Sequence, residues 1–379
     1  MTAHAFKVFA VLACTLFLAP ALTTAKESTA PTPVIVDTDM GFDDWMAILY
    51  LLNNPKVDVK AITVDCAGET YCPGGAINAA RLIEIAGKEM IPVFYGSEPI
   101  STLDYQYPTL IRYGASTMQV KGFSKYKGLP FYTDNAPAHL YHMIKEAGKN
   151  DTPLTLISIG SATNYAHTLQ LAKQYNDPDF SKGIKQFVKG GGAVGKVKDG
   201  VITNKHIVGN INIPTIFQSK NKTAEWNIYP NAEAASQLIT SGFPITLVPL
   251  NLTGHVPITQ SSYEELKAQA NSPLAKFVVQ VIIDNVTVQG GWGTAKLEYW
   301  DPAVVISALN PQLVTEKYLD VEMCVDTRNN KYHGTTYVNS DEKCTELNAP
   351  IGFVNVYTKI PKKSFVTEFV DVLNTTSKN

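Results

Sequence analysis

The sequence predicts an α/β fold: one domain built on a largely parallel (mixed), open, Rossmann-like sheet with helices on both faces. Two observations lead to this prediction. Short apolar runs rich in β-branched residues alternate along the chain with stretches of helical length and periodicity, as in strand–helix–strand units. Polar residues and glycines directly follow several of these runs, as they do where parallel strands end.

The predicted elements follow one another in a regular order. Residues 34–36 form the end of a buried strand, and 45–52 form the helix that packs on it. Further strands are expected at 59–65, 92–96, 154–159, 185–189 and 245–249. Further helices are expected at 75–86, 136–147, 165–175 and 232–241. The tail at 318–358 is richer in strand signals, and we expect a peripheral antiparallel ribbon there.

Composition limits the class of protein. With 379 residues, of which 45% are apolar and 17% charged, the chain can bury a large core. No linker, charge run, low-complexity tract or internal repeat divides it. The formal net charge of −2 gives no reason to expect nucleic acid as a partner.

The N-terminus predicts export. Lys7 precedes an apolar segment, 8–18, that has the length of a secretory signal core. Small residues follow, so we expect a signal peptide over 1–25 and a mature domain over 31–379. The protein would then be secreted or periplasmic. No second apolar segment is long enough to cross a membrane, so no membrane contact is expected after cleavage.

Cleavage would leave four cysteines, and an even number in an exported protein predicts disulfides. We expect Cys324 to pair with Cys344 across the C-terminal ribbon, and Cys66 with Cys72 across a short turn. The alternative is four buried free thiols.

Four carboxylates lie within eight positions directly after the first predicted strand: Asp37, Asp39, Asp43 and Asp44. Asp43 and Asp44 would fall in the first turn of the next helix, where the backbone dipole favours anions. The turn would lie at the carboxyl end of a strand, where open α/β sheets bind ligands. Acids this close repel one another, so a hard divalent cation with oxygen ligands would compensate them. The alternative is a solvated cluster that caps the helix.

Other polar residues follow predicted strands or begin helices. Thr163 and Asn164 lie in a turn after a strand, Glu225 follows a long polar loop, and Asp301 precedes Pro302. Taken singly, each has a structural explanation: Asp301 suits a helix cap, and Glu225 a solvated surface acid. They become functional candidates only if the fold brings them to the edge that carries Asp39.

Segment 37–44, which reads Asp-Thr-Asp-Met-Gly-Phe-Asp-Asp, resembles the DxDxGxDD signature of the nucleoside hydrolases, the inosine/uridine-preferring ribohydrolase family. Four later segments match this family in order. Residues 91–96 resemble its PVxxG strand, 160–164 its GPLTN turn, 223–228 its AEFNI segment, and 300–302 its HDP or WDP motif. The resemblance runs from about Pro33 to the C-terminus.

The resemblance implies Ca²⁺-dependent hydrolysis of the N-glycosidic bond of ribonucleosides to free base and ribose, as part of nucleoside salvage outside the cytoplasm. Asp39 would be the general base, with Asp37 supporting the cluster from behind. The Ca²⁺ ligands would be Asp39, Asp44, Asp301 and the backbone carbonyl of Thr163. The ribose-binding residues would be Asp43, Glu225 and Asn227.

Elementary chemistry agrees with these implied roles. Water on Ca²⁺ is only mildly acidified, so a carboxylate is needed to take its proton. Breaking an N-glycosidic bond builds positive charge on the sugar, which a pocket of acids stabilises.

The chain departs from the family pattern at several positions. Glu69 stands where the family has a ribose-binding Asn, and Asn221 would be the Asn that precedes the AEFN segment. The loop between Gly190 and Glu225 is longer than usual. Lys189 stands where the family often has an apolar residue.

The residue before Asp301 is Trp300 rather than the His that is tied to protonation of the leaving base. The Trp form resembles purine-preferring members, in which an indole stacks on the base and raises its proton affinity. Purine nucleosides are therefore the expected substrates. The opposite face of the base would be covered by Tyr105, Tyr107 or Trp292, unless these rings are ordinary core or surface residues.

Two other functions are compatible with the first motif. A haloacid-dehalogenase-type phosphatase would use Asp37 as nucleophile and Asp39 as acid/base, but a Thr or Val at Met40 and a later acidic pair are missing. The second of these functions is that of a secreted, Ca²⁺-stabilised binding protein with an inactive site. A homodimer and a homotetramer are both compatible with the sequence.

Overall fold

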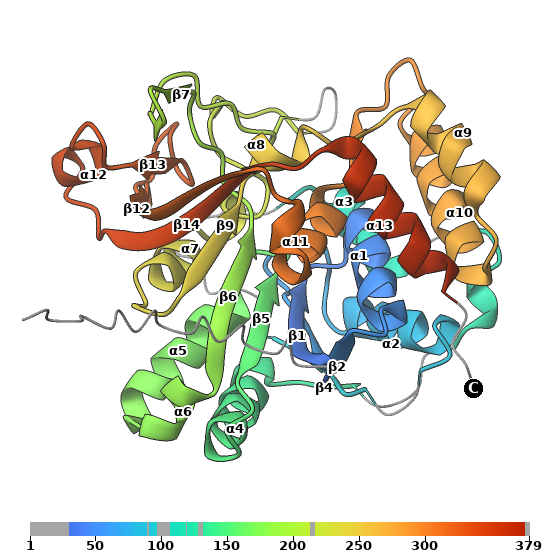
Figure 1. Cartoon of the computed structure of the whole chain (residues 1–379), viewed down its shortest axis with the longest axis horizontal. Helices are drawn as coiled ribbons and strands as arrows, with labels where there is room; N and C mark the ends of the chain where they lie inside the picture. Colours follow the sequence, from blue (N-terminus) through green and yellow to red (C-terminus); the bar gives the residue numbers. More distant parts are fainter. Residues whose placement is uncertain are drawn as a thin grey trace, which may run out of the picture. The chain divides into compact units, whose positions relative to one another are not determined.

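The computed structural model describes residues 30–88, 91–96, 107–118, 120–127, 132–212 and 217–375 (Figure 1). Residues Pro31–Asn379 form one unit. The strands of its central sheet are β1 (Thr32–Thr38), β2 (Val57–Val64), β3 (Val93–Tyr95), β4 (Tyr132–Thr133), β5 (Leu154–Ser158), β6 (Ile184–Gly190), β9 (Ile245–Val248), β12 (Glu316–Val325), β13 (Thr336–Val338) and β14 (Gly352–Lys359). Two short ribbons pair β7 (Val197–Lys198) with β8 (Val201–Ile202), and β10 (Pro257–Ile258) with β11 (Leu297–Glu298).

The α-helices connect and cover these strands. They are α1 (Phe42–Asn53), α2 (Gly74–Ile85), α3 (Thr109–Thr117), α4 (Ala136–Lys149), α5 (Thr163–Tyr175), α6 (Pro178–Lys182), α7 (Ala232–Ile239), α8 (Leu250–Thr253), α9 (Gln260–Gln269), α10 (Pro273–Val288), α11 (Trp300–Leu309), α12 (Lys343–Glu346) and α13 (Lys362–Asn374). Short 3₁₀ helices are η1 (Phe123–Lys125), η2 (Tyr229–Asn231) and η3 (Pro311–Leu313).

The central sheet confirms the predicted architecture. Its order is β13-β12-β14-β9-β6-β5-β1-β2-β3-β4. Every pairing from β14 to β4 is parallel, and β12 runs antiparallel to both β13 and β14. The expected C-terminal ribbon is therefore present, but it extends the main sheet, because β14 pairs directly with β9 at Asn355 and Thr246.

Alternation along the central strands supplies two cores. In β1, Val34 and Val36 pack on the side of α1, α2, α10, α11 and α13, whereas Ile35 packs on the side of α4, α5 and α7 (Figure 1). Successive side chains of a strand point to opposite faces, so a strand covered on both faces needs an unbroken apolar run. Full burial of each such side chain stabilises the fold by about 1.5–3 kcal/mol.

Two helix starts differ from the sequence-based expectation. Helix α5 begins at Thr163 rather than at 165, so Thr163 and Asn164 belong to its first turn. Helix α11 begins at Trp300, with Tyr299 as its N-cap residue and no side-chain cap. The expectation that Asp301 caps this helix is wrong. Tyr299 is the N-cap residue, and Asp301 lies in the first turn, where its carboxylate is close to those of Asp43 and Asp44.

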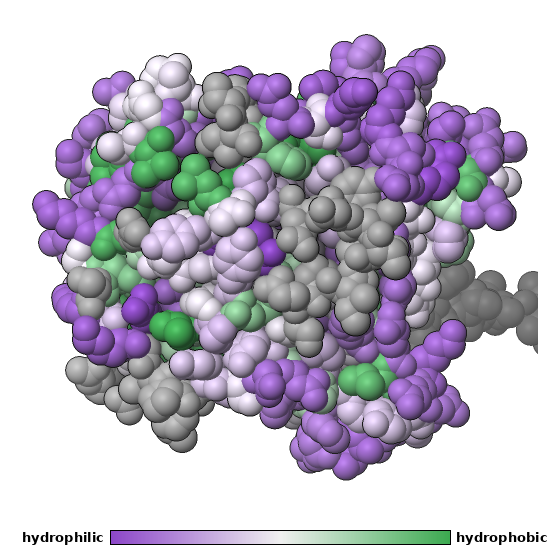
Figure 2. Space-filling model, turned by 180° about the vertical axis from the view of Figure 1, so that it is seen from behind, coloured by the Kyte–Doolittle hydropathy of each residue, from purple (hydrophilic) through white to green (hydrophobic). Residues whose placement is uncertain are grey.

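The outer surface carries hydrophilic residues with apolar ones in small separate groups, as Figure 2 shows for the face opposite that of Figure 1. In the described part of the chain, no helix combines the length and the apolar character needed to cross a membrane. The predicted signal peptide, 1–25, lies outside the described residues.

The structure pairs the cysteines as expected. Cys324 bonds to Cys344, with their Cα atoms 5.8 Å apart, and links β12 to α12. Cys66 bonds to Cys72, with their Cα atoms 5.7 Å apart, across the turn that holds Glu69. The two bridges enclose loops of different length, with sequence separations of 20 and 6 residues.

We predict that the longer bridge contributes more to stability. Replacing Cys324 and Cys344 by Ser should lower the free energy of unfolding by about 3 kcal/mol, and replacing Cys66 and Cys72 by about 2 kcal/mol, because a longer closed loop restricts the unfolded chain more. Denaturant unfolding without reductant measures both. Four free thiols in the denatured, unreduced parent would contradict the pairing itself.

Candidate active site

The turn after β1 is fixed by its own side chains. Met40 adopts the left-handed region, with φ of 63°, and its N–H donates to Thr38 Oγ1 at 3.0 Å. The hydroxyl of Thr38 in turn donates to the Asp44 carboxylate. The indole N–H of Trp45 donates to the Met40 carbonyl at 2.9 Å. The first motif therefore folds into a rigid turn that joins β1 to α1 and places Asp39 between them.

Two helix N-termini bring three acids together. Asp43 and Asp44 lie in the first turn of α1, and Asp301 lies in the first turn of α11. One carboxylate oxygen from each can be chosen so that all three lie within 4.8 Å of one another. Asp44 and Asp301 are buried. Each helix N-terminus stabilises a nearby anion by roughly 0.3–1 kcal/mol, which offsets only part of the repulsion.

Asp39 and Glu69 complete this acidic pocket. The backbone N–H of Glu69 donates to Asp39 Oδ2 at 3.1 Å. A Cβ atom on Gly68 would lie 1.9 Å from the same oxygen, so only glycine allows this approach. A Cβ atom on Gly41 would meet oxygens of Glu69, Asp44 and Asp43 at 2.9, 3.0 and 3.1 Å. The bare Gly41 backbone thus leaves a space bordered by three carboxylates.

The electrostatics of this pocket suit a cation. Burial first and neighbouring acids second raise the pKa values of Asp39, Asp43 and Asp301 well above the ordinary range for Asp. Burial, with the Asp44 charge, raises the pKa of Glu69 to about 7. Buried carboxylates are stable as anions only when a positive charge compensates them. The donors are all oxygens, as a hard divalent cation requires, so the residues present fit such an ion.

Asp37 lies beneath the pocket as a structural support. Its Oδ1 accepts hydrogen bonds from Thr63 Oγ1 and from Asn164 Nδ2, each at 2.7 Å. These bonds tie β1 to β2 and to the first turn of α5. Asp37 is fully buried, and burial raises its pKa well above the usual value. The sequence-based expectation that Asp37 supports the cluster from behind agrees with these contacts.

Asp65 is a buried acid that the sequence analysis missed. It directly follows β2, as Asp39 follows β1, and its Oδ2 accepts hydrogen bonds from Ser161 Oγ at 2.6 Å and from the Thr163 N–H at 2.9 Å. The available signal was its position after an apolar strand. Thr163, whose carbonyl is an expected metal ligand, is held from both sides, because its hydroxyl also accepts a hydrogen bond from Asn231 at 2.9 Å.

Glu225 is a buried, fixed carboxylate rather than a solvated surface acid. Its Oε2 accepts hydrogen bonds from the N–H groups of Gly192, Asn227 and Ile228 at 3.0, 2.9 and 3.2 Å. The side chain of Asn227 donates to the Ile159 carbonyl at 2.8 Å, at the end of β5. These two of the three expected ribose-binding residues therefore reach the carboxyl edge of the sheet.

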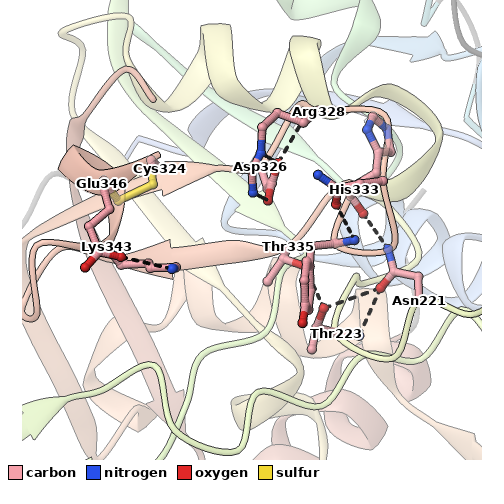
Figure 3. A network of polar contacts seen from close by, with 12 residues as sticks. Asn221, Thr223, Cys324, Asp326, Arg328, His333, Thr335, Lys343 and Glu346 are labelled. Atoms are coloured by element: carbon pink, nitrogen blue, oxygen red, sulfur yellow. Dashed lines mark hydrogen bonds and ion pairs between the residues drawn. A yellow bond between two sulfur atoms is a disulfide. The ribbon is translucent and has the colours of Figure 1, made fainter. Parts of the chain in front are cut away.

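Asn221 is engaged in holding its own loop. Its Nδ2 donates to the His333 carbonyl at 2.6 Å, and its Oδ1 accepts from the N–H groups of Thr223 and Ala224. Figure 3 shows this loop held against the segment between β12 and β13, where Thr223 also meets Thr335. These bonds occupy both ends of the amide, so the structure supports a role for Asn221 in loop geometry.

The aromatic residues separate into different groups. Trp300 packs edge to face with Phe42, with ring centroids 6.1 Å apart. Tyr107 stacks on Trp226 at 3.9 Å, and Trp292 packs on Tyr263 at 5.3 Å. Tyr105, the remaining candidate for the face opposite Trp300, lies outside the described residues.

Comparisons with known proteins agree on one family. The sequence model described as inosine-uridine preferring nucleoside hydrolase matches residues 34–368. The chain is 29% identical over 294 residues to probable uridine nucleosidase 2 of Arabidopsis thaliana, covering 74% of this chain and 79% of that protein. It is 27% identical over 295 residues to pyrimidine-specific ribonucleoside hydrolase RihA of Citrobacter koseri, covering 76% and 84%.

Solved structures show the same fold. A plant nucleoside hydrolase, PpNRh1, superposes with a TM-score of 0.67 and 25% identity over 91% of this chain and 100% of that one. The inosine-uridine preferring nucleoside hydrolase of Bacillus anthracis superposes with a TM-score of 0.68 and 19% identity over 90% and 99%. A purine-preferring ribonucleoside hydrolase of Gardnerella vaginalis gives 0.67 and 24% over 90% and 98%.

We predict that the metal-free protein becomes more stable on mild acidification because of this pocket. The pKa of Glu69 is about 7 when folded against an ordinary 4.5, so the folded state binds the proton more tightly than the unfolded chain does. The stabilisation that comes from protonating Glu69 is complete below about pH 4.5 and is lost as the pH rises through about 7. In chelator at pH 8, Glu69→Gln should raise the free energy of unfolding by about 1–3 kcal/mol.

The matched control is Glu265→Gln, at an exposed glutamate on α9, which should change little at any pH. Denaturant unfolding between pH 4.5 and 8 measures the difference from the parent. A Glu69→Gln protein that is less stable than the parent at pH 8 would contradict the assigned repulsion.

Proposed function

Because the chain belongs to the inosine-uridine preferring nucleoside hydrolase family and is thus a nucleoside hydrolase, we propose that it is a Ca²⁺-dependent enzyme that prefers purine ribonucleosides. We further propose that it acts outside the cytoplasm, in nucleoside salvage. One observation carries the proposal: Asp43, Asp44 and Asp301 meet beside Asp39 at the carboxyl edge of β1. The match to this family does not favour the two alternatives, a phosphatase and an inactive binding protein.

In the proposed mechanism Asp39 is the base. Its Oδ2 is fixed by the Glu69 N–H, which leaves Oδ1 to accept a proton from the attacking water. The residues that would hold the metal are Asp39, Asp44, Asp301 and the Thr163 carbonyl. When bound, a hard divalent cation would orient that water and lower its pKa.

The sugar is held and activated by the acids around it. Glu225, Asp43 and Asn227 would bind the ribose hydroxyls. Three backbone N–H groups fix Glu225 through its Oε2. As the N-glycosidic bond breaks, positive charge develops on the sugar. The surrounding carboxylates stabilise that charge more than they stabilise the neutral substrate, and such differential binding accelerates the reaction.

The leaving base is proposed to stack on Trp300, which Phe42 supports edge to face. A base leaves more readily when its ring is protonated, and an electron-rich indole favours a protonated ring. The names of the Arabidopsis and Citrobacter relatives make pyrimidine preference the competing possibility.

We predict that the purified mature protein releases reducing sugar from inosine, that chelator stops the release and that Ca²⁺ restores it. Asp39→Asn should lower turnover by more than the roughly hundred-fold usual for loss of a general base, because a ligand charge is lost with it. The control is Asp371→Asn, at an exposed aspartate on α13. Turnover by Asp39→Asn within about tenfold of the parent would remove Asp39 from the mechanism.

We also predict a higher kcat/KM for inosine than for uridine, since a purine offers more stacking area and a more basic ring. Trp300→Ala should lower kcat as well as binding, because the stacking strengthens while the base takes up a proton. Trp300→Phe, which keeps an aromatic ring, should fall between. Equal values for the two nucleosides, or a preference for uridine, would mean that another group activates the base.

A further inference from the structure

A buried lysine lies at the carboxyl edge of the central sheet. Lys189 is the penultimate residue of β6 and is fully buried. Its Nζ donates to the Gly160 carbonyl at 2.6 Å and to the Gly190 carbonyl at 2.5 Å. The ammonium group therefore joins the turn after β5 to the turn after β6, directly beside the proposed sugar site.

Several acids lie close enough to this ammonium group to interact with its charge. They are Glu225 from the loop before η2, Asp39 after β1, Asp301 in α11, Asp65 after β2 and Asp37 in β1. Glu225 lies on the same side of Gly191 as the ammonium group: a Cβ atom on Gly191 would lie 2.8 Å from Glu225 Oε2 and 3.2 Å from Lys189 Nζ. Both charged groups thus border the same point of the backbone.

A lysine here needs an explanation, because burying an ammonium group is costly unless it is paired. Burial lowers the pKa of Lys189, and Glu225 is the first of the acids that raise it. Conversely, burial raises the pKa of Glu225, and Lys189 is the largest influence that lowers it. Tyr107 also interacts electrostatically with this carboxylate.

We infer that Lys189 is a positioning residue for substrate binding: its ammonium group compensates the Glu225 carboxylate, and its hydrogen bonds join the turn after β5 to the turn after β6 beneath the ribose. This inference rests on the proposed function. An ionised Glu225 accepts hydrogen bonds from sugar hydroxyls, whereas a protonated one must use its free oxygen partly as a donor. The three backbone N–H groups fix the place of Glu225, and Lys189 fixes its charge.

The inference predicts a pH-dependent defect in binding. Lys189→Met keeps the chain length without the charge, so Glu225 should take up a proton at higher pH. The acid limb of 1/KM for inosine should move upward by about one to two pH units. KM should rise about tenfold or more near neutral pH and return toward the parental value at high pH, with a smaller change in kcat.

Two further variants separate charge from packing. Lys189→Arg keeps the charge and should keep the acid limb near its parental position even if KM changes. Lys145→Met removes a lysine of α4 that pairs with Asp177 at 2.5 Å and should leave KM and its pH profile unchanged. Thermal unfolding of each variant across the same pH range identifies the folded ones.

Several outcomes would overturn the inference. A folded Lys189→Met with the parental pH profile would do so, as would a KM defect of equal size at every pH. If Lys189→Met does not fold, Glu225→Gln in the parent decides: this change should remove the acid limb of 1/KM, and an unchanged limb would overturn the inference. Absence of ribose release by the parent would instead refute the proposed function.

Discussion

Mutual repulsion of buried carboxylates at the carboxyl edge of β1 is the constraint on which the rest of the site depends. Burial raises the pKa of Asp39, Asp43 and Asp301, and the neighbouring charges of Asp39, Asp43 and Asp44 raise the pKa of Asp301 further. Such a cluster persists only if each acid is compensated. The fold does this with hydrogen bonds to Asp37, Asp39 and Asp65 and with two helix N-termini, and a cation bound by the carboxylate oxygens would offset the rest.

The parallel sheet makes this concentration of charge possible. Parallel strands end at one edge, so Asp39 after β1, Asp65 after β2 and Lys189 near the end of β6 meet there although they are far apart in sequence. The apolar runs behind them pack on both faces of the sheet. The stability of the two cores therefore supports a polar edge that would be unstable alone, and the same rigidity preorganises the edge for binding.

Sequence patterns predicted the central strands β1, β2, β3, β5, β6 and β9, the helices α1, α2, α4, α5 and α7, and the Asp39–Asp44 turn, because strand alternation and helix starts are local properties of the chain. The helices α9, α10 and α13 and the short strands β4, β7, β8, β10 and β11 were not predicted. The sequence patterns also predicted both disulfides. Three features escaped prediction since they depend on tertiary contacts. Asp65 and Lys189 become significant only when neighbouring strand ends converge, and Asn221 turns out to be a loop support because His333, distant in sequence, supplies its partner. The attachment of the C-terminal ribbon to β9 likewise needed the sheet order.

That ribbon bears on the substrate site through the loop it holds. The segment that leads into Glu225 and Asn227 is long, and a free loop of this length would lose considerable entropy on binding a sugar. Here that entropy is already lost when the protein folds. The Thr336 hydroxyl forms hydrogen bonds with both the N–H and the carbonyl of Ala193, and the hydroxyls of Thr223 and Thr335 form a hydrogen bond at 2.6 Å. The Cys324–Cys344 bridge closes the ribbon that carries these partners (Figure 3). The C-terminal extension of the sheet thus fixes Glu225 and Asn227, two of the three proposed ribose-binding residues, before substrate arrives, which is how a distant structural element can raise affinity without touching the ligand.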